Sequence, residues 1–161
     1  MSFVVPFDGS ELAEAALTRA VQYGDALEET VVAVSVVPER KRYAREKGWI
    51  GADAPYDVEA AIETLRSQVL AIAPEVTFDY ARIREYPPAG AIADHVERLA
   101  LEHEPTVLVL GSDNVGSVVT PLSSVAATVA AEKRYDVYLV RHTEPPRLDA
   151  LEAADPARDP E

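Results

Sequence analysis

The chain alternates between short apolar runs and longer segments whose apolar residues recur every three or four positions. The runs are only a few residues long and rich in β-branched side chains, so they predict strands at 3–7, 31–37, 76–81, 106–110 and 137–140. The recurring apolar positions predict helices that begin near residues 11, 58, 92 and 121. Strands and helices therefore follow one another in strict alternation.

This alternation is typical of an α/β protein. With right-handed crossovers it predicts a doubly wound five-stranded parallel sheet with helices on both faces. The run 31–37 is almost wholly apolar, as a central strand requires, whereas 76–81 alternates apolar and polar residues, as an edge strand does. Strand order 3-2-1-4-5 satisfies both conditions.

The strand order also predicts where a ligand binds. The winding reverses between the first and fourth strands, and ligands bind beyond the carboxyl ends of strands at such a point. Asp8 follows the first strand and Gly111 ends the fourth, so we expect two distant turns to form one crevice. A strand, a small-residue loop and a helix N-terminus can surround a phosphate with backbone N–H groups. An ordinary strand-to-helix turn is the alternative at 106–125, and Asp8 or Ser10 can instead cap the helix that begins near residue 11.

Composition and charge narrow the possible functions. The 161 residues are 48% hydrophobic, enough for one folded domain, and contain no cysteine, which excludes disulfides and thiol chemistry. A net charge of −13 argues against binding nucleic acid or an anionic membrane, and suits a salt-adapted, halophilic cytoplasm. The N-terminus leads directly into a strand and shows neither a signal peptide nor a membrane span, so we expect a cytoplasmic location without membrane insertion.

Two segments depart from the regular pattern. We expect residues 1–142 to form the α/β domain and the acidic, proline-containing residues 143–161 to be a disordered tail. The connection 39–57 is long and carries five of the basic residues together with the only tryptophan, Trp49. It is interpreted as a solvated helical turn with a flexible loop. The alternative is a lid or docking segment whose positive charge meets an anionic ligand.

Several short motifs occur at informative places. They are Val5-Pro6-Phe7-Asp8-Gly9-Ser10, the strand end Val-Ser35-Val36-Val37, the turn Leu-Val-Leu-Gly111-Ser112, Ser124-Val125-Ala126 and the closing Val-Tyr-Leu-Val140-Arg141. On these motifs, residues 3–141 resemble the universal stress protein family. The resemblance implies an α/β fold and a possible adenine-nucleotide site, for ATP or AMP with magnesium.

Nucleotide-binding members of that family hold phosphates with Gly-x-x-Gly, nine residues, then Gly-Ser or Gly-Thr. Here Gly111 is present, Asn114 stands for the second glycine, the gap is one residue short and Ser123 replaces the third glycine. Side chains at these positions narrow the space for phosphate, so we expect weak or no ATP binding. The resemblance implies a nucleotide site formed by Pro6, Phe7, Asp8, Val36, Gly111, Ser112, Asn114, Ser123, Ser124 and Val125, with Asp8 and Val36 at the ribose and adenine.

Three functions fit these features. The first is a non-enzymatic stress-response module that acts through a protein partner. We expect this module to be a homodimer, because an apolar strand at the edge of a sheet needs covering and related proteins pair through the last strand. The residues of that strand are Val137, Tyr138, Leu139 and Val140. The second is an ATP binder or slow ATPase, and the third a regulator of a membrane transporter contacted by the basic segment 40–47. No Gly-x-Ser-x-Gly elbow marks a catalytic serine, and the three histidines lie in no cluster with metal-ligand spacing.

Overall fold

The computed structural model describes residues 2–39, 41–51, 57–83, 91–111 and 135–144. Its strands are β1 (Ser2–Pro6), β2 (Thr30–Pro38), β3 (Thr77–Ile83), β4 (Pro105–Gly111) and β5 (Asp136–Val140). Its helices are α1 (Glu11–Leu27), α2 (Lys41–Glu46), α3 (Val58–Ile72) and α4 (Ala91–Leu101). The helix expected to begin near residue 121, and nearly all of the expected tail, lie outside the described residues.

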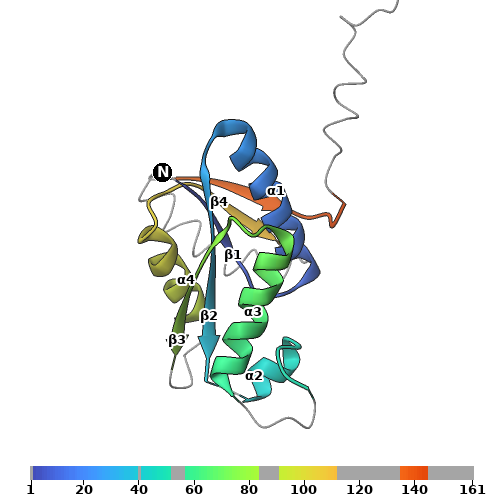
Figure 1. Cartoon of the computed structure of the whole chain (residues 1–161). Helices are drawn as coiled ribbons and strands as arrows, with labels where there is room; N and C mark the ends of the chain where they lie inside the picture. Colours follow the sequence, from blue (N-terminus) through green and yellow to red (C-terminus); the bar gives the residue numbers. More distant parts are fainter. Residues whose placement is uncertain (1, 40, 52–56, 84–90, 112–134, 145–161) are drawn as a thin grey trace, which may run out of the picture.

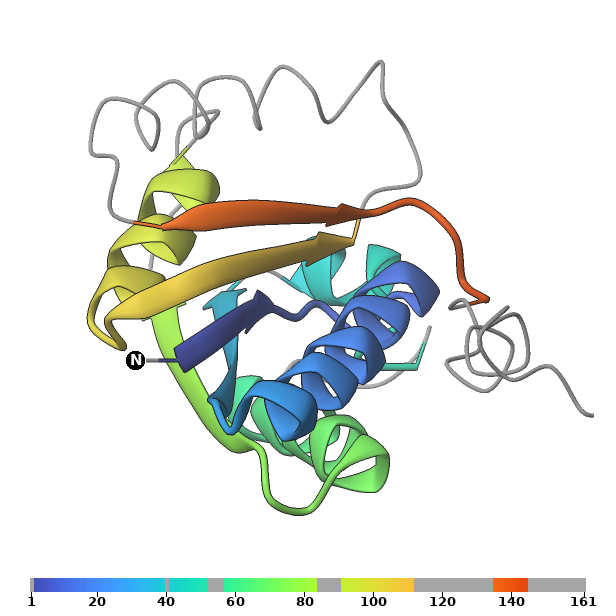
Figure 2. The ribbon, with the colours of Figure 1, turned by 90° about the horizontal axis from the view of Figure 1, so that it is seen from above.

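The described strands form one five-stranded sheet in the order β3-β2-β1-β4-β5, and every neighbouring pair is parallel. This confirms the predicted topology. β1 lies at the centre, with Val4 in register with Val32 on one side and Leu108 on the other. Because β2 is buried along all but its first residue, its continuous apolar run is explained. β3 and β5 are the two margins, and Figure 2 shows β5 beside β4.

Helices cover both faces of the sheet, as expected. α1 and α3 lie on one face and α4 on the other (Figure 1). Successive residues of a strand point to opposite faces, so β1 contributes to two cores. Phe3 and Val5 pack in the core under α1 and α3, and Val4 packs in the core under α4.

Short polar side chains fix the starts of the two long helices. Ser10 is the N-cap of α1, where its Oγ accepts a hydrogen bond from the N–H of Ala13 at 3.2 Å. Asp57 caps α3 by accepting from the N–H of Glu59 at 3.0 Å. Of the two caps that the sequence allowed for α1, Ser10 is therefore the one used, which leaves Asp8 available for other contacts.

The connection between β2 and α3 is more ordered than the sequence indicated. α2 occupies its first part, and the side chains of Ala44 and Trp49 are buried, at 0% and 5% exposure. Trp49 packs in the core under α1 and α3. The expectation of a solvated segment is therefore wrong for these two residues, because an indole at the end of the turn reaches the core.

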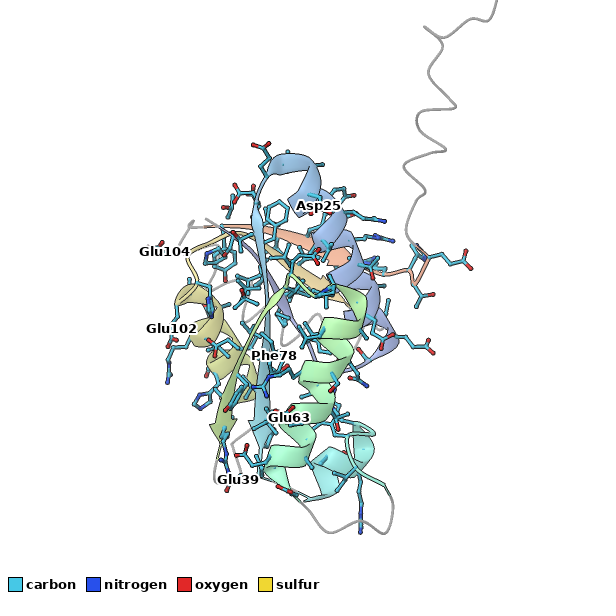
Figure 3. The ribbon with its side chains drawn as sticks, in the orientation of Figure 1. Asp25, Glu39, Glu63, Phe78, Glu102 and Glu104 are labelled. Carbon is cyan, nitrogen blue, oxygen red and sulfur yellow. The ribbon has the colours of Figure 1, made fainter. Side chains whose placement is uncertain are left out.

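Acidic side chains occur on several elements of the described part of the chain. Figure 3 labels Asp25 on α1, Glu63 on α3, and Glu102 and Glu104 at the end of α4, and all four are exposed. This distribution accounts for part of the net charge of −13. No helix in the described part of the chain combines the length and the apolar character needed to span a lipid bilayer.

Candidate functional site

The turn between β1 and α1 is held firmly to the neighbouring strand. The N–H of Phe7 donates to the carbonyl of Val34 at 2.8 Å, which extends the β1–β2 ladder by one residue. The buried hydroxyl of Ser35 donates to the carbonyl of Phe7 at 2.6 Å. Gly9 then takes a φ of +81°, a conformation that glycine adopts without strain, and the chain enters α1. The backbone around Asp8 is thus fixed from both sides.

The end of β4 packs directly against the start of α1. A methyl group added to Gly111 would lie 2.4 Å from the carbonyl oxygen of Leu12 and 2.9 Å from the nitrogen of Ala13. Both are backbone atoms, so this close approach requires glycine. The turn that carries Asp8 leads into that same helical turn. Two segments a hundred positions apart in sequence therefore meet where the winding of the sheet reverses, as the strand order predicts.

Asp8 is the most heavily engaged group of this turn. One carboxylate oxygen accepts from the N–H of Ser10 at 3.0 Å, and the other lies 2.6 Å from Nζ of Lys47. The indole N–H of Trp49 donates to the backbone carbonyl of Asp8 at 2.8 Å. Burial by itself raises the pKa of Asp8, but the bonds from Lys47 and Ser10 and the charge of Lys47 outweigh it and hold that pKa below 3.8. The group is therefore a carboxylate at neutral pH.

The remaining residues of the expected nucleotide site divide into two groups. Pro6, Phe7 and Asp8 share one turn, and Val36 lies near the end of β2 with its side chain buried under α4. The backbone N–H and carbonyl groups of a strand point alternately to its two neighbours, so those of Val36 point to the same side as those of Val34, toward β1. β1 pairs with β2 only as far as Val34, so Val36 lies beyond its end. The others lie outside the described residues: Ser112, Asn114, Ser123, Ser124 and Val125.

Sequence reasoning missed Lys47, Trp49 and Ser35 as members of this site. Lys47 belongs to the basic segment that was interpreted as facing solvent, with contact to an anionic ligand as the alternative, and in the structure its ammonium meets Asp8. Trp49 stood out as the only tryptophan, but its partner lies 41 positions away. No spacing rule links such distant residues, so the sequence offered only their unusual composition as a signal.

The expected dimer strand lies at the margin of the sheet. Val137 is 44% exposed, Tyr138 and Leu139 are half-buried, and Val140 is buried. Behind this strand the buried Arg19 of α1 donates to the hydroxyl of Tyr138 and to the carbonyl of His142, both at 3.3 Å. The guanidinium thus ties β5 and the residues after it to α1.

No group of three or more metal-binding side chains occurs among the residues that the structure describes. Among the histidines, His103 has a structural role, because its Nε2 lies 2.7 Å from a carboxylate oxygen of Asp79 on β3. The second carboxylate oxygen of Asp79 accepts from the N–H of Tyr80 at 2.8 Å. This pair joins the end of α4 to the edge strand.

Comparison with known proteins decides the family. The model of the universal stress protein family matches residues 1–155, nearly the whole chain. The chain belongs to the universal stress protein family. A search of curated proteins found no match.

Solved structures of universal stress proteins share this fold. One, in complex with cAMP, is 22% identical over 89% of this chain and 98% of its own, with a TM-score of 0.54. Another, from Archaeoglobus fulgidus in complex with dAMP, is 23% identical over 88% of this chain and 98% of its own, with a TM-score of 0.52. A third, from Burkholderia pseudomallei, is 20% identical over 87% and 95%, with a TM-score of 0.50. At these identities the likeness concerns the fold.

Proposed function

We propose that this universal stress protein binds an adenine mononucleotide in the crevice between the β1–α1 turn and the end of β4. It acts in the cytoplasm as a regulatory module for a protein partner rather than as an enzyme. The observation that carries the proposal is the contact of Gly111 with the first turn of α1, which brings the Asp8 turn and the start of the 111–125 segment together. Two structures of the same fold support the ligand class, since one is a complex with cAMP and the other with dAMP.

Each part of the crevice has a chemical role in this proposal. The carboxylate of Asp8 accepts a hydrogen bond from a ribose hydroxyl, the role that acidic residues play in other nucleotide-binding α/β folds. The backbone of Val36, on the side where β1 has ended, pairs with the polar edge of adenine. The 111–125 segment supplies Gly111, Ser112, Asn114, Ser123, Ser124 and Val125 to the phosphate. Pro6 and Phe7 fix the position of Asp8.

A mononucleotide fits the sequence better than ATP does. Asn114 and Ser123 stand where nucleotide-binding relatives carry glycines, and a backbone cradle for a triphosphate favours glycine at such positions. Asp8 precedes α1, and Glu11 and Glu14 lie in its first turn, so their negative charges oppose the extra charge of a triphosphate. We therefore propose binding of AMP without a requirement for magnesium and without turnover of ATP.

Calorimetric titration of the full chain with AMP, ADP and ATP, each with and without magnesium, tests this function. We expect saturable AMP binding, weaker ATP binding and no release of phosphate. The variant Asp8→Asn should bind AMP about tenfold more weakly, because a charge-assisted hydrogen bond is lost. Asp25→Asn, an exposed acid near the far end of α1, should bind like wild type. Tight binding of ATP with magnesium and steady phosphate release would replace this proposal by the slow-ATPase alternative, and no binding of any nucleotide would contradict both.

A homodimer through β5 is the second part of the proposal. β5 pairs with β4 and lies at the margin of the sheet with Val137 44% exposed, which leaves an apolar strand for a second copy to cover. Light scattering after size exclusion should give twice the chain mass. Val137→Lys should shift the protein to monomers with unchanged circular dichroism, because a charged side chain discourages edge pairing. A monomeric wild type, or a dimeric Val137→Lys, would contradict this assignment.

A further inference from the structure

Lys47 is held against the Asp8 turn by the residues next to it as well as by its own side chain. After α2, the N–H of Gly48 donates to the carbonyl of Arg45 at 3.0 Å, and the N–H of Trp49 donates to the carbonyl of Ala44 at 2.9 Å. The buried indole of Trp49 then bonds to the carbonyl of Asp8. The segment that carries Lys47 is therefore anchored in the core, two residues from the ammonium that meets Asp8.

The charge of Lys47 changes what the crevice accepts. Asp8 is a carboxylate at neutral pH. Glu11 and Glu14 lie in the first turn of α1, where their negative charges offset the positive end of the helix dipole. Without a cation this end of the crevice repels anions. Nζ of Lys47 lies 2.6 Å from the carboxylate of Asp8, which makes the pair neutral overall. The side chains of Lys47 and Asp8 are 35% and 37% exposed, so both reach solvent and an incoming ligand.

We infer that Lys47 sets the ligand class of the crevice by favouring a phosphorylated adenine nucleotide over the uncharged nucleoside adenosine. This rests on the proposed function, because Asp8 must lie beside the bound ribose. A phosphate attached to that ribose lies within the range of the ammonium, and adenosine carries no charge for Lys47 to attract. Removing the ammonium leaves the carboxylate of Asp8 uncompensated beside the phosphate. This lowers the affinity for the nucleotide and leaves the affinity for the nucleoside unchanged.

The test compares AMP with adenosine in wild type and in variants of the full chain. Trp49 is the only tryptophan and bonds to Asp8, so its fluorescence reports ligand binding at this turn, with calorimetry as a second readout. Lys47→Gln should weaken AMP about fivefold, the size of one partly exposed ion pair, and change adenosine less than twofold. Lys47→Arg should keep the preference for AMP. Arg45→Gln removes the same charge from an exposed position on the same segment, and should leave both affinities within twofold of wild type.

Each other outcome overturns the inference in a distinguishable way. Equal weakening of AMP and adenosine by Lys47→Gln assigns Lys47 a role in the shape of the turn. Tighter binding of both ligands means that Lys47 blocks Asp8. Equal effects of Lys47→Gln and Arg45→Gln assign the preference to the net charge of the segment. In these three cases the proposed nucleotide site survives, whereas the proposed function fails, and this inference with it, only if wild type and all variants bind neither ligand.

Discussion

Replacing Gly111 with alanine is the sharpest perturbation of the junction between β4 and α1. The added methyl would lie 2.4 Å from the carbonyl oxygen of Leu12, whereas carbon and oxygen atoms normally approach to about 3.3 Å. The end of β4 or the start of α1 must therefore move by about 1 Å. Overpacking of this kind costs about 1–3 kcal/mol. The backbone of Gly111 is not in the left-handed region, so strain in φ adds nothing to this cost.

The free energy of unfolding from urea titration measures this cost, and the fall in Tm should be roughly 3–10 °C for a domain of this size. If the two turns did not touch, alanine would stabilise the protein by about 0.4–1 kcal/mol, because it restricts the unfolded chain. The sign of the change in the free energy of unfolding therefore distinguishes the two cases. A Gly111→Ala variant as stable as wild type, or more stable, would refute the close contact between the end of β4 and the start of α1. Gly48 is the control: an added side chain there meets open space, so Gly48→Asn should cost little, since asparagine tolerates its φ of +74°, whereas Gly111→Asn should cost at least as much as Gly111→Ala.

Three further predictions concern groups around the same turn and strand. Ser35→Ala removes a buried hydroxyl that bonds the β1–α1 turn, and should lower the urea-derived stability by about 1–2 kcal/mol, against less than about 0.5 kcal/mol for the exposed Ser67→Ala. Arg19→Gln should lower the free energy of unfolding by about 1–3 kcal/mol, because it releases β5 from α1, and the exposed Arg98→Gln should be nearly neutral. Equal losses of stability in the two variants would contradict the role of Arg19 in joining β5 to α1. Folding lowers the pKa of Asp8 from 3.8, so the ionised carboxylate stabilises the folded protein at pH values above 3.8. This contribution to the free energy of unfolding is lost as the pH falls through the pKa of the folded state. The stability difference between wild type and Asp8→Asn, below about 1 kcal/mol at pH 7 for so exposed a pair, should therefore shrink by pH 3, and a constant difference would rule out the ion pair.

The sequence predicted the sheet correctly because local patterns determine it. The apolar run of β2 and the alternation of β3 distinguish a central strand from an edge strand, and the crossover rule then leaves few topologies. The meeting of the end of β4 with the start of α1 followed from the same order. These inferences need only the period of the pattern and the handedness of the chain, both of which are properties of short segments.

Contacts around the β1–α1 turn could not be predicted from such patterns. Whether Asp8 or Ser10 caps α1 depends on the turn geometry, since both residues are good caps. The pairing of Lys47 with Asp8 depends on how the turn after α2 folds back, which Trp49 determines by packing in the core. Charge runs usually face water, and that rule described Arg45 but did not extend to Ala44 and Trp49, which are buried in the same segment.

The measurement that tests the central claim most directly is an amide NMR titration of the full chain with AMP. Binding at the junction of the two turns should shift the backbone amides of Asp8, Val36 and Gly111 together, with one common dissociation constant, and leave those in the middle of α3 unchanged. Shifts at only one of the two turns, or shifts confined to other parts of the molecule, would contradict a single adenine-nucleotide crevice built from both.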